Sequence, residues 1–265
     1  MLEVKNLSVN YYTEEEIVKA VDRVSFTVAK GEALGIVGES GSGKSTIALA
    51  VMRLIAPPGR IVAGEVFFNG QDLMKLSEKK MIEVRGAKIS IVFQDPFTSL
   101  NPVFTIGEQI AEAVRVHQGL NRKLAWKKAI EMLALVQINN PTARAADYPH
   151  QFSGGMRQRA MIAMALACQP QLLIADEPTT ALDVTIQAEI LRLLKELQKR
   201  LGLSIIYITH NFGIIREICD RVVVVHQGLI VEEGKIPQLL DNPKASYTKK
   251  LIDCLKTLRG DREWH

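Results

Sequence analysis

One stretch decides the fold of this chain: Ala33-Leu34-Gly35-Ile36-Val37-Gly38-Glu39-Ser40-Gly41-Ser42-Gly43-Lys44-Ser45-Thr46. Its first five residues form an uninterrupted apolar run, which is typical of a short strand buried on both faces. A helical pattern follows over residues 47–54. Between them, residues 38–45 match G-x-x-x-x-G-K-[ST] in the required context of a strand before and a helix after. The stretch therefore predicts a phosphate-binding loop.

The residue types in this loop suit a phosphate chain. Glycines allow backbone N–H groups to turn inward around phosphate oxygens, and the helix N-terminus adds its positive dipole end. Lys44 supplies a mobile cation, and Ser45 offers a hydroxyl to Mg²⁺. The residues predicted to bind nucleotide here are Gly38, Glu39, Ser40, Gly41, Ser42, Gly43, Lys44, Ser45 and Thr46.

The composition around this loop is that of a folded domain. The chain has 265 residues, of which 47% are hydrophobic and 23% charged, so it can bury a core and intrinsic disorder is disfavoured. The net charge of +4 is small and spread along the chain, and it does not by itself argue for nucleic acid. The sequence has no signal-peptide pattern and no run of 18 apolar residues, so a membrane crossing is not expected.

Strand and helix patterns alternate along the chain. Alternating residues at 3–9 and 21–28 predict the first strands, and helical periods dominate from residue 97 to 152. Further predicted strands are Leu172–Ala175, Ser204–Ile208 and Val222–Val225, and predicted helices are Gly107–Val116, Lys123–Val136, Met156–Cys168 and Ile186–Leu201. Such alternation indicates a mainly parallel α/β sheet, into which the middle segment is inserted as a helical region.

Two carboxylates follow the predicted strand at residues 172–175. Asp176 stands where a phosphate-binding-loop ATPase places the aspartate on its metal side. Glu177, one residue further, is placed to orient an attacking water or to act as a general base. A structural strand end before Pro178 is the alternative when these two residues are taken alone.

A third motif opens another helix. Ser153 is a plausible N-cap, and Gly154 and Gly155 leave backbone N–H groups uncovered, so a second anion site is predicted. An ordinary capped helix is the alternative for this pattern in isolation.

The order of these motifs resembles the nucleotide-binding subunit of ABC transporters, over residues 1 to 255. The resemblance implies that Gly38–Thr46 is the Walker A loop, Ser153-Gly154-Gly155 the signature, and Asp176 the Walker B aspartate. It implies catalytic roles for Glu177, His210 and Gln94, a D-loop role for Asp183, and Mg²⁺ binding by Ser45, Gln94 and Asp176. The implied cofactors are ATP and Mg²⁺. Gln94 is also expected to contact nucleotide.

Three local features refine the comparison. Tyr11 is similar to the aromatic residue that stacks on adenine, and Tyr12 is a close rival. Met156 stands where many members carry glutamine, which leaves the serine and both glycines of the signature intact. The base-reading motif Asn-Lys-x-Asp of GTPases does not occur.

The resemblance implies a single domain over residues 1–265. The expected fold is a RecA-like P-loop NTPase core with an N-terminal antiparallel β subdomain and an inserted helical signature subdomain. Residues 1–96 and 160–240 are expected to form the nucleotide-binding core, 97–159 the helical subdomain and 241–265 a C-terminal tail.

The extended segment from Phe93 to Pro102, the residues from Asp176 to Thr185 and the tail at Tyr247–Leu251 resemble the ATPases of oligopeptide, dipeptide and nickel importers. The expected function is to energise import of di- or oligopeptides, or of nickel-type solutes, through ATP-driven dimer closure. Expected partners are a second ATPase subunit, two membrane permeases and, indirectly, an extracellular solute-binding protein, with no nucleic acid. The expected location is the cytoplasmic face of the membrane.

Three questions stay open at this point. The resemblance does not select the solute or decide between a homodimer and a heterodimer. Many of these relatives carry a cysteine-rich C-terminal segment with an iron–sulfur cluster, whereas Cys254 has no cysteine near it in the sequence, so no cluster is expected. A soluble ABC-type ATPase acting on nucleic acid or ribosomes is the alternative function, disfavoured by the absence of a coiled-coil insertion and of a second cassette.

Overall fold

The computed structural model describes residues 1–180 and 182–259, without the side chains of residues 96, 97 and 254–259. Position 181 and residues 260–265 of the predicted C-terminal tail lie outside the described residues. The chain forms two compact units. The first comprises Met1–Leu76 together with the described residues from Ile206 on, and the second comprises Ser77–Ile205.

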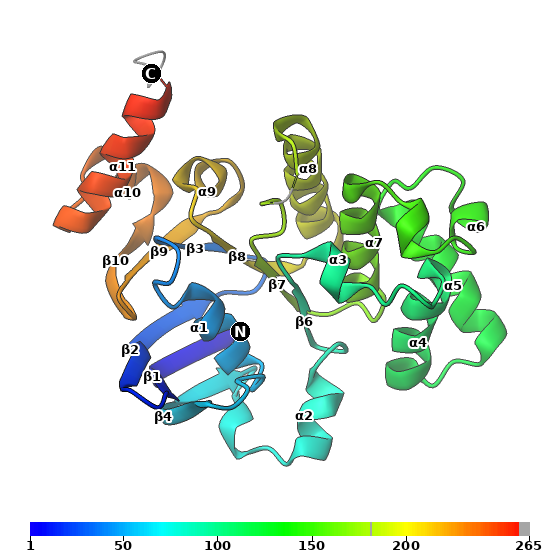
Figure 1. Cartoon of the computed structure of the whole chain (residues 1–265), viewed down its shortest axis with the longest axis horizontal. Helices are drawn as coiled ribbons and strands as arrows, with labels where there is room; N and C mark the ends of the chain where they lie inside the picture. The colour runs from blue at the N-terminus through cyan, green and yellow to red at the C-terminus, as the bar shows by residue number, and fades with distance from the viewer. Residues whose placement is uncertain (181, 260–265) are drawn as a thin grey trace. The chain divides into compact units, whose positions relative to one another are not determined.

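The first unit contains an antiparallel sheet with the strand order β2-β1-β4-β5. In it β1 (Leu2–Tyr12) pairs with both β2 (Ile17–Val28) and β4 (Gly59–Phe68), and β5 (Gln71–Asp72) pairs with β4. Figure 1 shows these strands next to one another, drawn in blue and cyan. The predicted N-terminal antiparallel β subdomain is thus confirmed.

The first unit also holds parallel strands. All five residues of β3 (Ala33–Val37) are buried, and β3 pairs in parallel with β9 (Arg221–His226), which pairs antiparallel with β10 (Leu229–Lys235). The remaining elements are α1 (Lys44–Val51), the 3-10 turn η1 (Leu73–Lys75), α9 (Phe212–Ile218), α10 (Ile236–Asp241) and α11 (Ser246–Arg259). Strand β8 (Ser204–Thr209) carries the boundary between the two units.

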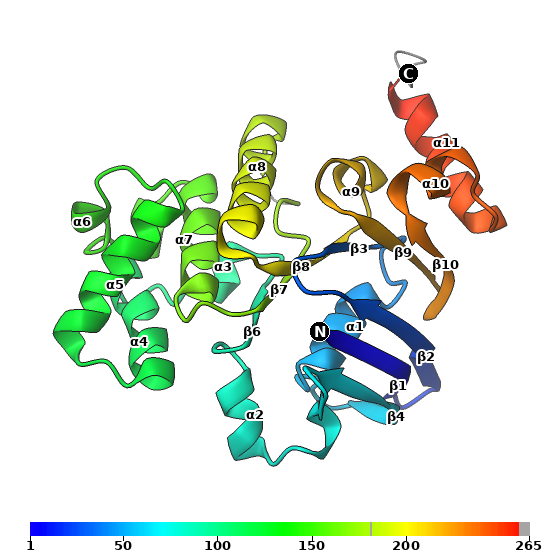
Figure 2. The same cartoon turned by 180° about the vertical axis from the view of Figure 1, so that it is seen from behind.

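The second unit is mostly helical and contains one parallel strand pair, β6 (Ile89–Val92) with β7 (Leu172–Asp176). Its helical elements are α2 (Glu78–Val84), α3 (Pro96–Ser99), α4 (Ile106–Gln118), α5 (Arg122–Leu135), α6 (Pro141–Arg144), the 3-10 turn η2 (Pro149–Gln151), α7 (Gly154–Leu166) and α8 (Val184–Leu201). Figure 2 shows α4, α5, α6 and α7 gathered in one group.

The helix after the phosphate-binding loop differs from its prediction. It runs from Lys44 to Val51, three residues ahead of the predicted bounds at each end. It begins early because Gly43 takes a left-handed N-cap conformation with φ +102°. It ends early because Arg53 is left-handed, with φ +51°, and the N–H of Leu54 donates to the Leu49 carbonyl at 2.8 Å. This closure is a Schellman motif, formed here without glycine.

Periodicity alone did not identify β4, β6 and β10. Four of the seven β4 residues before Val66 are exposed, and β6 spans only four residues, so neither has a clear alternating pattern over a useful length. The predicted functional division into 1–96 with 160–240, 97–159 and 241–265 does not follow the boundaries of the two compact units and stays a prediction.

Candidate functional site

The phosphate-binding loop lies in the first unit, between β3 and α1. Gly41 and Gly43 have φ values of +76° and +102°, a region that residues with a Cβ rarely adopt. The N–H of Ser42 donates to the Glu39 carbonyl at 3.2 Å and closes a turn inside the loop. The local sequence therefore forms the tight glycine-dependent turn that its pattern predicted.

Lys44 turns back into this loop. Its side chain is buried, and its Nζ donates to the carbonyl oxygens of Glu39 at 2.6 Å and Gly38 at 2.9 Å. A buried ammonium is tolerated only when it is well hydrogen-bonded, and these carbonyls supply that stabilisation. The cation is thus held against the first two residues of the loop. Ser45 lies exposed at the start of α1, and Thr46 is half-buried behind it.

Neighbouring backbone segments enclose the loop closely. A Cβ added to Gly38 would collide with the carbonyl oxygen of Val225, and one added to Gly43 would collide with that of Ala20. The N–H of Gly228, in the turn between β9 and β10, donates to the Ser42 carbonyl at 3.0 Å. Close packing therefore requires glycine at positions 38 and 43, and at position 43 the backbone conformation requires it as well.

Two carboxylates end β7 in the second unit. Asp176 is its last residue and is buried, whereas Glu177 follows it half-buried. Glu177 has φ +45°, a left-handed conformation that costs a non-glycine residue about 1–2 kcal/mol. Such an outlier at a strand end favours a functional interpretation of Glu177, since the surrounding structure has to maintain it.

The Glu177 carboxylate is held by two side chains. Its Oε2 accepts a hydrogen bond from Oγ1 of Thr180 at 2.8 Å and another from Nε2 of Gln94 at 3.2 Å. Gln94 comes from the segment after β6, which pairs with β7, so the parallel strand pair brings the two residues together. The structure thus places two of the predicted catalytic residues in direct contact.

The signature residues begin α7, as predicted. Ser153 is the N-cap, and its Oγ accepts from the N–H of Met156 at 3.3 Å. A Cβ on Gly155 would lie 2.7 Å from Cγ2 of Ile186, in the first turn of α8. Gly155 therefore allows the beginnings of α7 and α8 to approach closely.

Two arginines in the first turns of α7 bind neighbouring segments of the second unit. Nε of Arg157 donates to the Pro149 carbonyl at 2.7 Å, and Arg159 donates to the Val136 carbonyl at 3.0 Å. Arg159 also forms an ion pair with Glu189 of α8 at 3.0 Å. Both guanidinium groups thus hold α7 against its neighbours in the second unit.

Asp183 and His210 occupy the ends of other elements. Asp183 is exposed and caps α8, with its Oδ1 accepting from the N–H of Ile186 at 3.0 Å. His210 is exposed immediately after β8, before Asn211 caps α9. The predicted D-loop and switch roles remain predictions, as do the Mg²⁺ contacts of Ser45, Gln94 and Asp176.

The two candidate adenine-binding tyrosines have different surroundings. Tyr11 is half-buried and packs against Gly59, where an added Cβ would lie 2.7 Å from its ring. Tyr12 is exposed, and the Arg60 guanidinium lies 5.4 Å from its ring centroid. Because a cation already covers Tyr12, we retain Tyr11 as the predicted stacking residue.

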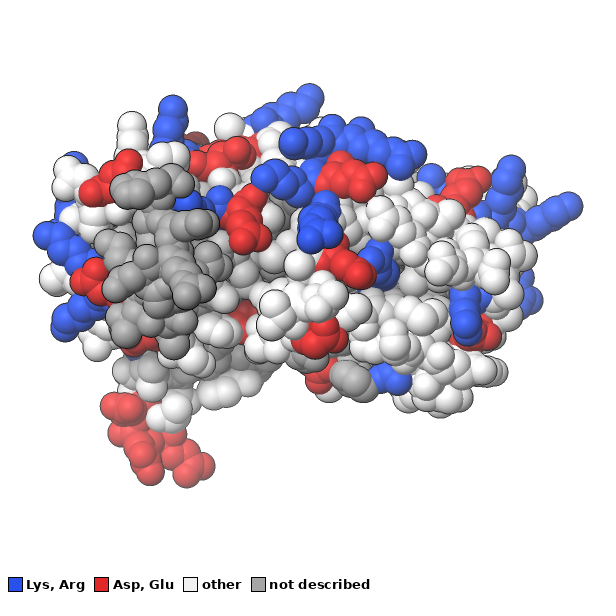
Figure 3. Space-filling model, turned by 90° about the horizontal axis from the view of Figure 1, so that it is seen from above, with Lys and Arg blue, Asp and Glu red and all other residues white. Residues whose placement is uncertain are grey.

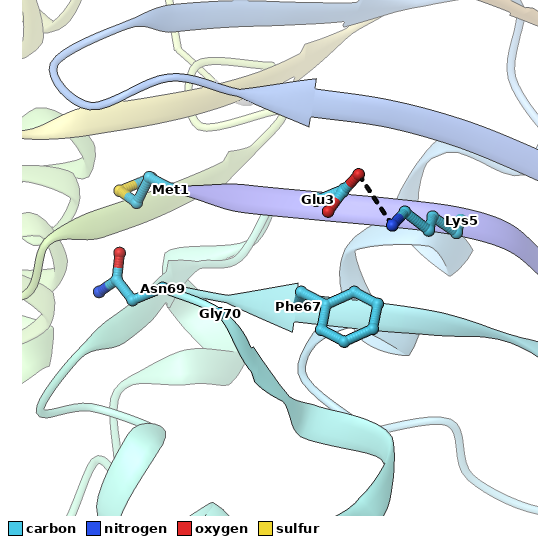
Figure 4. Close-up of a pocket in the computed structure, with 6 residues that line it drawn as sticks. All are labelled: Met1, Glu3, Lys5, Phe67, Asn69 and Gly70. Carbon is cyan, nitrogen blue, oxygen red and sulfur yellow. Dashed lines mark ion pairs between the residues drawn. The ribbon is translucent and has the colours of Figure 1, made fainter.

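A shallow pocket of about 390 Å³ beside β1 and β4 contains none of the predicted site residues. Its lining residues, drawn in Figure 4, are Met1, Glu3, Lys5, Phe67, Asn69 and Gly70. The Lys5 ammonium pairs with Glu3 at 3.1 Å and lies 5.0 Å from the Phe67 ring centroid, so its charge is already compensated.

Sequence reasoning assigned no role to Thr180, Gln109 or Tyr247, although each contacts a functional segment. Thr180 lies three residues beyond Glu177, a spacing that suits a turn with side-chain hydrogen bonds. Gln109 binds the backbone of the loop before α4, and Tyr247 binds a loop residue 208 positions away in the sequence. No local sequence pattern indicates either contact.

These features define a nucleotide-binding protein of the P-loop α/β class, and the chain belongs to the ABC transporter family, whose model matches residues 21–180. Within this family it is an ATP-binding subunit with ATPase activity. Among the described residues, no helix has the length and apolar character needed to span a bilayer.

Two relatives and one solved structure illustrate the similarity. The chain is 52% identical, over 99% of its length and 79% of the relative's, to "Probable peptide ABC transporter ATP-binding protein y4tR" of Sinorhizobium fredii. It is 51% identical, over 99% of its length and 74% of the relative's, to "Oligopeptide transport ATP-binding protein OppD" of Bacillus subtilis. It matches the ATP-binding cassette MJ0796, solved as a dimer in a post-hydrolysis state with ADP and Pi, with TM-score 0.79 and 31% identity over 89% of this chain and 99% of that one.

Proposed function

We propose that this chain binds and hydrolyses ATP to energise a membrane importer for di- or oligopeptides, and that it works on the cytoplasmic face of the membrane. Two relatives named for peptide transport match it at about half identity over nearly its whole length. The same resemblance leaves nickel-type solutes as the alternative cargo.

The observation that carries the ATPase assignment is the restraint of Glu177. The backbone of Glu177 is left-handed, and hydrogen bonds from Gln94 and Thr180 fix the direction of its carboxylate. In our proposal Glu177 orients the attacking water and accepts its proton, while Gln94 fixes the direction of the carboxylate. His210 stabilises the γ-phosphate.

The phosphate-binding loop supplies electrostatic stabilisation. Its inward N–H groups and the Lys44 ammonium would compensate the charge of the phosphate chain. Mg²⁺, when bound, would neutralise charge on the transferring phosphoryl group. Ser45, Gln94 and Asp176 provide the hydroxyl, amide and carboxylate oxygens that this hard cation prefers.

The expected partners follow from a model in which two ATPase subunits share each bound nucleotide, which we call the shared-site model. A second ATPase subunit, either another copy or a sister chain, would supply Ser153, Gly154 and Gly155 to the nucleotide bound by this chain. ATP would close this dimer, and hydrolysis would reopen it. On the face in Figure 3, basic side chains are interspersed with acidic ones.

The segment after Gln94 is our candidate for contact with the membrane permeases. In it the side chains of Val103 and Phe104 are 70% and 50% exposed, respectively. Gln109 of α4 holds this loop by accepting from the Asn101 N–H at 2.8 Å and donating to the carbonyls of Asn101 and Phe104, both at 3.0 Å. A rigid loop with apolar side chains at its surface suits docking against a protein partner. The extracellular solute-binding protein would act on this chain only indirectly, through the permeases.

The function is tested by uptake in cells that depend on this chain. Lys44→Ala removes the loop's cation, so we expect loss of ATP turnover and loss of labelled dipeptide and oligopeptide uptake. Lys30→Ala, at an exposed turn before β3, is the matched control and should keep both. Radioactive nickel uptake measured in parallel separates the two cargo classes.

The outcomes separate the two parts of the proposal. Uptake of nickel but not of peptides would contradict peptide import and leave the ATPase assignment standing. Unchanged ATP affinity and turnover in Lys44→Ala would contradict the phosphate-binding loop itself.

A further inference from the structure

The C-terminal helix contacts the phosphate-binding loop directly. Tyr247 lies in the first turn of α11, and its hydroxyl accepts a hydrogen bond from the backbone N–H of Glu39 at 3.0 Å. The two residues are 208 positions apart in the sequence, yet both belong to the first compact unit. Glu39 is the second residue of the predicted nucleotide-binding loop.

The Tyr247 side chain is held in this position. Its ring stacks on the His226 imidazole, with the ring centroids 3.9 Å apart and an interplanar angle of 27°. Burial raises the pKa of the Tyr247 hydroxyl, despite the opposing effect of the Glu39 N–H, so the phenol stays neutral across the physiological pH range. A ring fixed by stacking loses little further freedom in forming the hydrogen bond.

The start of α11 is anchored as well. The two carboxylate oxygens of Glu232 on β10 accept from the N–H groups of Lys244 at 2.8 Å and Ala245 at 3.0 Å. Both residues directly precede the helix, so its first turn is tied to β10. Figures 1 and 2 show α11 beside α10 and β10 in both views. Tyr247 is therefore presented to the loop from a fixed support.

The same region contacts the loop at a second point. His226 ends β9, and two residues later the Gly228 N–H donates to the Ser42 carbonyl at 3.0 Å. The loop is thus hydrogen-bonded near its beginning by Tyr247 and near its middle by Gly228. We call these two contacts, together with the stacking of Tyr247 on His226, the C-terminal brace.

The C-terminal brace is linked to Lys44 through one residue, Glu39. The N–H of Glu39 donates to Tyr247, while the carbonyl of Glu39 accepts from Lys44 Nζ at 2.6 Å. A rotation of the backbone at Glu39 would therefore shift the carbonyl that positions the ammonium. Ordering the loop in advance spares the entropy that nucleotide binding would otherwise cost.

We infer that Tyr247 is a positioning residue for nucleotide binding: through the Glu39 N–H it holds the loop, and with it Lys44, in the conformation that receives the phosphate chain. This inference rests on the proposed ATP-binding function. It assigns a role to the tail motif that the proposed function leaves without one.

The test is Tyr247→Phe in the full chain, which keeps the ring and its stacking and removes only the hydroxyl. Loss of one hydrogen bond predicts an ATP dissociation constant higher by about 3- to 10-fold. At saturating ATP the turnover number should stay within about twofold of the original, because Tyr247 touches no reacting atom. Hydrogen–deuterium exchange at the Glu39 amide should be faster. Calorimetry, steady-state kinetics and mass spectrometry measure the three quantities.

Tyr148→Phe is the matched control, since Tyr148 is an exposed tyrosine that stacks on a histidine, His150, in the second unit. It should bind ATP as the original chain does. An equal loss of affinity in both variants, or an unchanged dissociation constant in Tyr247→Phe, would overturn the inference. If Tyr247→Phe does not fold, His226→Ala replaces it: weaker ATP binding supports the brace, and original affinity contradicts it. A wild-type chain that binds no ATP would instead contradict the proposed function.

Discussion

Glu177 combines three structural features. It follows a fully buried strand, it has a left-handed backbone, and its carboxylate accepts hydrogen bonds from two side chains. The backbone conformation costs free energy, and the surrounding structure has to maintain it. The buried Lys44 ammonium is likewise held by hydrogen bonds, here to two carbonyl oxygens of the phosphate-binding loop.

At this scale the prediction concerns Glu177→Gln. The substitution keeps the shape and removes the negative charge that would accept a proton from water. We expect ATP affinity to stay within a few-fold and hydrolysis to fall by about 10²- to 10⁴-fold. Phosphate release and equilibrium nucleotide binding measure the two effects. Glu131→Gln, at an exposed position of α5, is the control and should hydrolyse ATP normally. Hydrolysis at the original rate in Glu177→Gln would show that another group is the base.

Among the helices, α4 combines a structural and a surface role. Its buried face includes Ile106, Ile110 and Val114, and Gln109 is the polar member of that face. Instead of disrupting the core, the Gln109 amide satisfies backbone groups of the preceding loop, as buried polar groups generally must. The exposed Val103 and Phe104 are thereby supported from beneath.

Gln109→Leu tests this element. The variant leaves Asn101 and Phe104 backbone groups without their partners, so we expect unfolding free energy to fall by about 1–3 kcal/mol in urea titrations. ATP binding by the isolated chain should persist, because the hydrogen bonds that hold Lys44 belong to the first unit. Peptide uptake in cells should fall. Gln118→Leu, exposed at the end of α4, is the control, and normal uptake in Gln109→Leu would exclude this loop from coupling.

For the whole molecule the question is how one chain becomes a working pair. The phosphate-binding loop belongs to the first compact unit, whereas the signature and Glu177 belong to the second. A solved relative of the same fold is a dimer. Our shared-site model places the signature of one subunit against the nucleotide of the other.

Glu177→Gln provides the assay for this model, since blocked hydrolysis should trap the closed pair. Light scattering after size exclusion should give a doubled mass with ATP, and the monomer mass without it, for the chain alone or mixed with its partner ATPase. Adding Ser153→Glu places a negative charge at the signature and should abolish the ATP-dependent dimer by repulsion. A double variant that still dimerises would contradict the model, and so would a single variant that never dimerises with any partner.

The sequence by itself determined the local features of this protein. The phosphate-binding loop, the buried strand before it and the cap at Ser153 each depend on a few adjacent residues. Their geometry follows from backbone dihedral preferences and short-range hydrogen bonds, which a contiguous pattern encodes. The family resemblance extended this to Gln94 and His210 as candidates, without contacts.

Only the tertiary structure decided which distant groups meet. Gln94 reaches Glu177 across 83 residues because β6 pairs with β7, and Tyr247 reaches Glu39 across 208 residues because α11 is anchored on β10. Gly155 proved to be required by Ile186 of another helix. Such contacts depend on strand pairing and helix packing, which are set by burial summed over the whole chain and leave no periodic signal near either partner.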